Sequence, residues 1–154
     1  MKSKSRTVLS SGLLAGTLDI LAAILIYAVL LHKTTAEKIL QSIASGIFKQ
    51  EAYIGGSQMA VYGLLLHYFI AFAFAYFFFK IYPYFPFLQK NTVFSGVLYG
   101  LFVWIVMNLI VLPITFPKLP SKHFDFPLLL SILILIFCVG IPIAFITKKH
   151  YTYR

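Results

Sequence analysis

Two ionisable side chains stand near the middle of long apolar stretches, and the sequence hints at chemistry there more than anywhere else. Asp19 lies near the midpoint of an apolar run over residues 8–31, and His67 near the midpoint of a second run over residues 56–79. An ionisable group in hydrocarbon costs about 3 kcal/mol by insertion scales, so it persists only where it is paired, hydrated or used. Because both fall at similar depth, the sequence predicts a buried polar pair, linked directly or through one water.

An Asp–His pair at that depth is compatible with three roles: a buried polar contact that fixes the register of two helices, a proton or cation relay, and a metal or haem ligand. Imidazole exchanges its proton near neutral pH, and a neighbouring carboxylate couples to that exchange. A haem in a bundle usually needs two axial ligands, and zinc needs more ligands than this pair supplies. The other histidines are expected at or beyond the ends of the apolar runs: His32, His123 and His150. We therefore expect no metal and no cofactor.

Four apolar stretches fill most of the 154-residue chain and indicate its fold class. About 20 apolar residues cross the hydrocarbon core of a bilayer, and each stretch reaches that length. The chain is 60% hydrophobic and 11% charged, far from the average of soluble proteins. We expect one domain over residues 1–154, an all-α polytopic membrane protein with four transmembrane helices. The predicted spans are residues 8–31, 56–79, 92–115 and 126–147.

The basic residues outside the spans predict the orientation of the chain. Eight of the 13 Lys and Arg residues lie in the N-terminal segment, the segment between the second and third spans, and the C-terminal segment; five lie in the other two segments. Cytoplasmic segments carry an excess of Lys and Arg, so both termini are predicted to be cytoplasmic. The net charge of +9 is scattered over short segments with no helix to present it, which argues against nucleic acid as a partner.

The segment between the first two spans has the pattern of an amphipathic helix. Its apolar residues recur at helical spacing from Ala36 to Phe48. Thr34 followed by Glu37 has the spacing of a capping box, which predicts a helix over residues 34–49. That helix is too short and polar to span, so we expect it in the outer interface or across the mouth of the bundle. The pattern predicts burial of Ile39, Ile43 and Ile47, and exposure of Lys38, Gln41 and Ser45.

Small residues mark the faces on which the spans can approach one another. Two pairs have GxxxG spacing, and one further glycine shares a stripe with His67; the predicted packing residues are Gly12, Gly16, Gly63, Gly96 and Gly100. Polar groups that flank the Asp–His pair are Tyr27, Tyr62, Tyr99 and Asn108. In the fourth span, Pro142 has no N–H to donate to the carbonyl of Cys138, which leaves a spare acceptor.

Four short motifs carry a resemblance to a known family. They are Gly-Leu-Leu-Ala-Gly at 12–16, Ile-Tyr-Pro at 81–83 after the aromatic span of His67, Ser-Gly-Val-Leu-Tyr-Gly at 95–100, and His-Phe-Asp-Phe-Pro at 123–127. Through them, about residues 12 to 127 resemble the YagU-like family of small bacterial inner-membrane proteins. The resemblance implies an inner-membrane location, no established enzymatic activity, and a loose link of one member to survival in acid. The last motif places His123 and Asp125 in an outer loop.

The sequence leaves two main classes of function open. The spans supply no nucleophile, base and charge stabiliser at one depth, so we expect no enzyme, and an intramembrane enzyme acting on lipid is the weakest alternative. The first class is a small membrane protein that moves or senses protons through Asp19 and His67. The second is a structural or accessory subunit of a larger membrane complex. The expected partners are the lipid bilayer and either a second copy of the chain, as a homo-oligomer, or that larger complex.

Overall fold

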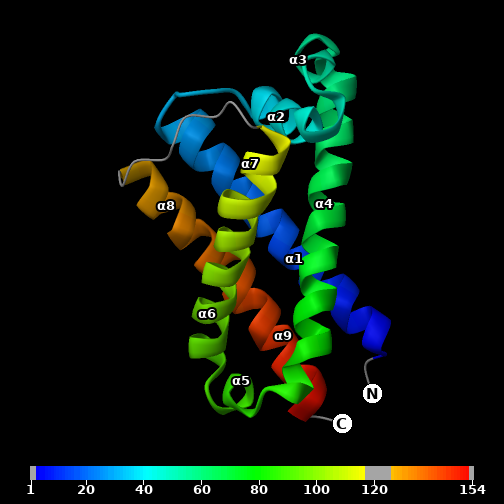
Figure 1. The fold of residues 1–154 in the computed structure, drawn as a ribbon, viewed down its shortest axis with the longest axis vertical. Coiled ribbons are helices and arrows are strands. Elements are labelled where there is room, and N and C mark those ends of the chain that lie inside the picture. The colour runs from blue at the N-terminus through cyan, green and yellow to red at the C-terminus, as the bar shows by residue number, and fades with distance from the viewer. Residues whose placement is uncertain (1–2, 117–125, 153–154) are drawn as a thin grey trace.

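The computed structural model describes residues 3–116 and 126–152, and every secondary-structure element in these ranges is helical. Four long helical rods dominate the fold (Figure 1). All four are long and apolar enough to cross a membrane, which confirms the all-α polytopic architecture. In chain order the rods are α1 (Lys4–Ala23) with the π-helix η1 (Ile24–Leu30); α4 (Gly56–Ile81) with the 3₁₀ turn η2 (Tyr82–Tyr84); α6 (Thr92–Ile105), π-helix η3 (Val106–Val111) and α7 (Leu112–Thr115); and α8 (Phe126–Ile134), π-helix η4 (Leu135–Gly140) and α9 (Ile141–Thr152).

The rods extend past the predicted apolar runs at the end of the bundle that holds both termini. The first begins at Lys4, the second reaches Tyr84 and the fourth reaches Thr152, whereas the third occupies residues 92–115 as predicted. Hydropathy detects the part of a helix in hydrocarbon, but a helix continues through the headgroup layer, where lysine and tyrosine place polar tips in water. The predicted spans are therefore the cores of longer helices.

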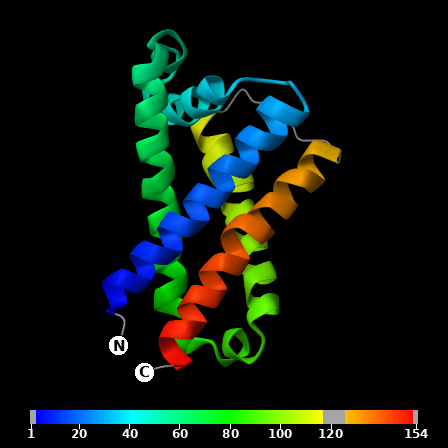
Figure 2. The ribbon, with the colours of Figure 1, turned by 180° about the vertical axis from the view of Figure 1, so that it is seen from behind.

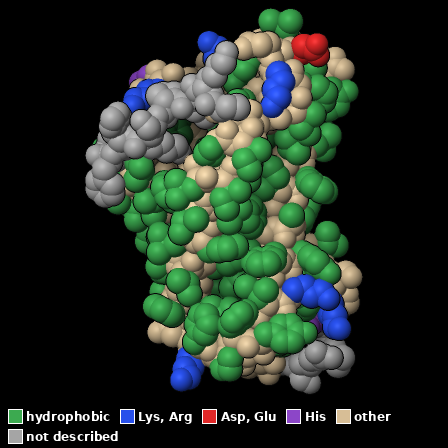
Figure 3. All heavy atoms as spheres, viewed as in Figure 1, with side chains coloured by type: hydrophobic (Ala, Val, Ile, Leu, Met, Phe, Trp, Pro, Cys, Tyr) green, Lys and Arg blue, Asp and Glu red, His purple; other side chains and the backbone are tan. Residues whose placement is uncertain are grey.

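The rods form a bundle in which the first and fourth cross the second and third at a steep angle (Figures 1 and 2). Helix α1 packs against α4 and α9, and α6 packs against η4 and α9. Large apolar side chains cover the outside of the rods (Figure 3), as expected for helices surrounded by lipid. The buried core contains alanines, branched aliphatic residues and aromatic residues: Ala15, Ala75, Phe78, Tyr82, Leu88, Tyr99, Val103, Val139, Ile143 and Ala144.

Glycines set the closest approaches between spans. A Cβ atom built on Gly100 would lie 2.5 Å from the Cα atom of Ile136, and one built on Gly96 would lie 2.7 Å from the Cα atom of Ile141. Gly140 meets the backbone of Gly96 and Gly100 from the other side. The third and fourth rods therefore touch through their backbones, which only residues without a side chain permit.

Two short helices close the end of the bundle opposite the termini (Figure 1). They are α2 (Ala36–Phe48) and α3 (Glu51–Ile54), and at the other end the short α5 (Pro86–Lys90) links the second and third rods. Helix α2 lies across the bundle mouth and packs against α4. This is one of the two placements that the sequence predicted, the other being the outer interface. Its cap differs from the prediction: the side chain of Thr35, not Thr34, accepts a hydrogen bond from the N–H of Lys38, at 3.2 Å.

The buried face of α2 also differs from the prediction. Gln41 and Ser45 are buried, whereas Ile47 is 62% exposed and Ile39 and Ile43 are half-buried. The polar face packs inward because Gly63 of α4 lets the backbone of α2 come into direct contact. Polar partners satisfy this face, since the Gln41 side chain donates to the Gly56 carbonyl at 3.1 Å and the Ser45 hydroxyl lies 3.2 Å from that of Tyr53.

Candidate functional site

A cavity of about 280 Å³ lies between the four rods, and α2 contributes to its wall. Apolar side chains make up most of the lining, with Ile70 and Phe74 from α4, Val103 from α6 and Ile43 from α2. Five polar side chains also line it: Asp19, Tyr27, His67, Asn108 and Ser131. The predicted pair of Asp19 and His67 is thus brought onto one cavity, by α1 and α4 respectively.

His67 is fixed by a backbone group of the neighbouring helix. Its Nε2 atom lies 2.8 Å from the carbonyl oxygen of Gly16. A carbonyl can only accept, so Nε2 carries the hydrogen and donates it, and Nδ1 is the atom at which the ring can gain a proton. The approach depends on Gly16, because a Cβ atom there would lie 3.0 Å from both the Cβ of Ala71 and the ring of Tyr68.

Asp19 follows Gly16 by three residues, so it lies on the same face of α1, and it is half-buried. Its carboxyl group is within electrostatic reach of His67 and of the Cys138 thiol. Within the described ranges Asp19 and His67 form no direct hydrogen bond or ion pair with each other, and the alternative, a link through one water, stays a prediction. The imidazole instead reaches the carbonyl one turn before the carboxylate, and the two groups share a cavity wall.

The predicted flanking polar groups divide into two pairs. Asn108 and Tyr27 line the cavity; the Asn108 amide donates to the Trp104 carbonyl at 3.1 Å, and the Tyr27 hydroxyl donates to the Pro127 carbonyl at 3.5 Å. Tyr62 and Tyr99 do not line it.

Those two tyrosines serve helix packing. The ring of Tyr62 stacks on Phe48 of α2 with centroids 5.5 Å apart. The Tyr99 hydroxyl donates to the carbonyl of Phe74 at 2.6 Å, within the core. Ser131 also lies on the cavity wall, and its hydroxyl accepts a hydrogen bond from the Trp104 indole at 2.8 Å. His123 and Asp125 lie outside the described residues.

All three π-helices of the described chain face the cavity. Tyr27 of η1, Asn108 of η3 and Val139 of η4 are lining residues. π-helical turns are rare, and they occur frequently at functional sites. Pro113 and Pro142 lie two residues beyond η3 and η4, and a proline that cannot donate its hydrogen bond disturbs the preceding turns. Prolines inside two apolar spans were therefore a sequence signal for η3 and η4, whereas η1 has no proline near it and arises from packing.

The other two described histidines, His32 and His150, lie away from the cavity. His32 follows η1 in a left-handed conformation with φ of 47°, and Nδ1 of His150 lies 2.9 Å from the Thr7 hydroxyl, between α9 and α1. Within residues 3–116 and 126–152, no group of three or more His, Cys, Asp and Glu side chains is placed to hold a metal ion.

Comparisons with protein-family models, with curated proteins and with solved structures found no match. The resemblance to the YagU-like family stays a prediction. Function is therefore inferred from the fold and from the cavity between the rods.

Proposed function

We propose that this multi-pass membrane protein binds and releases a proton at its central cavity, with Asp19 as the acceptor and His67 as its coupled partner. The observation that carries the proposal is the convergence of a carboxyl and an imidazole group, from two spans, on one largely apolar cavity. An ionisable residue within a membrane span is costly and marks a functional site by default. Asp19 is the sole acidic residue within the described spans.

The hydrogen bonds assign a role to each atom. Because Nε2 of His67 keeps its hydrogen for the Gly16 carbonyl, only Nδ1 exchanges a proton with the cavity. Asp19 takes up a proton at its carboxylate. The two groups are close enough to interact electrostatically, so the proton affinity of each depends on the charge of the other.

The proposal places both termini in the cytoplasm and the chain in a bacterial inner membrane. The distribution of basic residues along the sequence supports the first part, since eight Lys and Arg residues lie in the two terminal segments and the segment between the second and third spans, and five lie in the other two segments. In this orientation α2, which contributes Ile43 to the cavity wall, lies on the outer side of the membrane.

The alternative, an accessory subunit, would be favoured by small-residue stripes left facing lipid after the rods pack. The glycines that the sequence marks are instead used within the chain: Gly12 lies against Phe72, Gly16 against Tyr68, Gly63 against α2, and Gly96 and Gly100 against the fourth rod. The proton-binding proposal therefore has the stronger support.

A hydrophobic carbodiimide tests the proposal, because it modifies protonated carboxyl groups that it reaches from an apolar phase. We expect labelling of the full chain in liposomes at Asp19, and this labelling should decrease as the pH rises and the carboxyl group loses its proton. Asp19→Asn removes the labelling and the pH-dependent proton flux. His67→Gln keeps a donor for Gly16 but changes the pH at which labelling is half-maximal. Glu37→Gln is the matched control, since Glu37 is an exposed carboxylate of α2, and it changes neither readout.

Two outcomes would contradict the proposal. One is labelling and proton flux of Asp19→Asn at the wild-type level. The other is wild-type labelling that does not vary with pH, which would leave Asp19 and His67 as a purely structural pair and favour the accessory subunit.

A further inference from the structure

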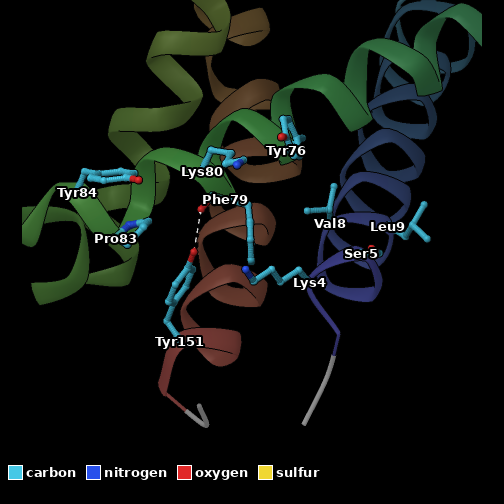
Figure 4. Close-up of a pocket in the computed structure, with 10 residues that line it drawn as sticks. All are labelled: Lys4, Ser5, Val8, Leu9, Tyr76, Phe79, Lys80, Pro83, Tyr84 and Tyr151. Atoms are coloured by element: carbon cyan, nitrogen blue, oxygen red, sulfur yellow. Dashed lines mark hydrogen bonds between the residues drawn. The ribbon is translucent and has the colours of Figure 1, made fainter.

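A second pocket, of about 640 Å³, opens between the first turns of α1 and the last turns of α4 (Figure 4). Lys4 of α1 and Lys80 of α4 are lining residues, and Lys4 reaches across toward Phe79. Apolar surface from Val8, Leu9 and Phe79 alternates in the lining with tyrosines, which are Tyr76, Tyr84 and Tyr151. Tyr151 is itself held in place, because its hydroxyl donates to the Phe79 carbonyl at 3.2 Å.

The charge of this pocket is positive and uncompensated within the described chain. Lys80 has its Nζ atom 5.7 Å from the centre of the Tyr76 ring, and neither Lys4 nor Lys80 forms an ion pair with a described residue. The described acidic residues lie elsewhere: Glu37 and Glu51 belong to α2 and α3 at the opposite end, and Asp19 lies at mid-span. A ligand that bears a negative charge would therefore complete this site.

The position of the lysines along the spans identifies the environment of the pocket. Lys4 begins the first span, and Lys80 lies near the end of the second, which runs to Tyr84. Both therefore lie at the level of lipid headgroups, where tyrosine is also enriched. Below them, Leu9 is 57% exposed and Tyr76 is 53% exposed, so an apolar surface continues from the pocket toward the hydrocarbon.

We propose that this pocket binds an anionic glycerophospholipid, with its phosphate between Lys4 and Lys80 and an acyl chain along Leu9. Basic pockets between transmembrane helices recognise anionic headgroups in this way. The hydroxyls of Tyr76 and Tyr84 are donors for the headgroup oxygens. A zwitterionic lipid brings its own ammonium group, which the two lysines repel. This inference is independent of proton binding at the central cavity, since the two sites share no lining residue.

Native mass spectrometry of the full chain in detergent tests the inference. The probe is an equimolar mixture of phosphatidylglycerol and phosphatidylethanolamine with identical acyl chains. We expect the wild type to retain phosphatidylglycerol preferentially, and the double variant Lys4→Gln with Lys80→Gln to lose that preference by about tenfold. The double variant Lys4→Arg with Lys80→Arg keeps both charges and retains the lipid. Lys90→Gln removes one charge from α5 at the same end, outside the pocket, and leaves the preference unchanged.

Several results would overturn the inference. If Lys90→Gln lost as much of the preference for phosphatidylglycerol as the Lys4→Gln and Lys80→Gln double variant, the preference would come from the general positive charge of this surface and not from the pocket. Loss of the lipid from the arginine pair as well as the glutamine pair would show that charge is not what holds it. Displacement of the lipid by soluble glycerol phosphate at equal concentration would identify a site for a free anion, and a wild type with no preference would remove the site altogether. Circular dichroism confirms that each variant keeps its helices.

Discussion

Gly63 lies where α2 crosses α4, and its missing side chain decides how closely the two helices approach. A Cβ atom at this position would collide with the carbonyl oxygen of Leu40 and lie 2.7 Å from the carbonyl carbon. These are backbone atoms, which cannot rotate away as the end of a long side chain can. The sequence marks Gly63 as a packing residue, but the partner is α2 rather than another span.

We expect Gly63→Ala to lower the free energy of unfolding by about 1–3 kcal/mol, because the added methyl group must push α2 away. Gly46→Ala is the matched control on α2 itself, since a Cβ atom there meets only the Thr115 side chain at 3.6 Å, an ordinary contact. That control should raise stability by about 1 kcal/mol, the helix-propensity gain. Thermal unfolding in detergent measures both, and equal effects would mean that the crossing tolerates a side chain.

Individual residues of the candidate site could be predicted where a polar side chain stands within an apolar span. Asp19 and His67 stand out because each interrupts an apolar span, and the structure places both on one cavity. The partner of His67 was not predictable, since it is the carbonyl of Gly16, and every residue of a sequence carries such a group. Tyr62 and Tyr99 were predicted beside the pair on polarity alone, and packing uses them elsewhere.

At the scale of elements, α2 shows where the usual rule for amphipathic helices fails. In water an apolar stripe packs inward, but lipid accepts isoleucine as readily as a protein interior does, so a helix at a membrane surface need not bury its apolar stripe in the protein. The face that carries Gln41 and Ser45 therefore packs against α4 and α3, where Gly56 and Tyr53 respectively are its hydrogen-bond partners. The helical spacing of its apolar residues predicted that this helix exists. The same spacing did not predict which of its faces packs against the protein.

The start of α2 gives a second prediction. Thr35→Ala should cost about 1 kcal/mol, because its hydroxyl caps the N–H of Lys38, whereas Thr34→Ala should be neutral. Hydrogen exchange of the amides in the first turn of α2 measures the difference, and it should accelerate in the first variant alone. Faster exchange in Thr34→Ala instead would restore the capping box predicted from the sequence.

For the molecule as a whole, hydropathy predicts the number and type of the long helices, because twenty apolar residues have few alternatives to a membrane span. Hydropathy carries no information on which rods touch. Glycine spacing indicated the close approaches, but the cavity and the π-helices around it arise from how four rods and α2 fit together.

Orientation is a property of the whole molecule, and it can be measured at two lysines at opposite ends, Lys38 on α2 and Lys90 on α5. In a chain with Cys138→Ala, we expect Lys38→Cys to react with a membrane-impermeant thiol reagent added outside intact cells. Lys90→Cys should react only after the cells are opened. The reverse pattern would place the termini outside and α2 in the cytoplasm.

The glycine contacts between the third and fourth rods have a mechanical consequence. Where Gly140 meets Gly96 and Gly100, backbone lies on backbone, and no rotamer change is available to absorb a displacement. The first and second rods are joined through side chains instead, by His67 on Gly16 and by the hydroxyls of Thr17 and Tyr68 at 2.8 Å. Because side chains can change rotamer and backbone cannot, we expect the third and fourth rods to keep their spacing, and any change in the volume of the cavity to come from sliding of the first rod along the second.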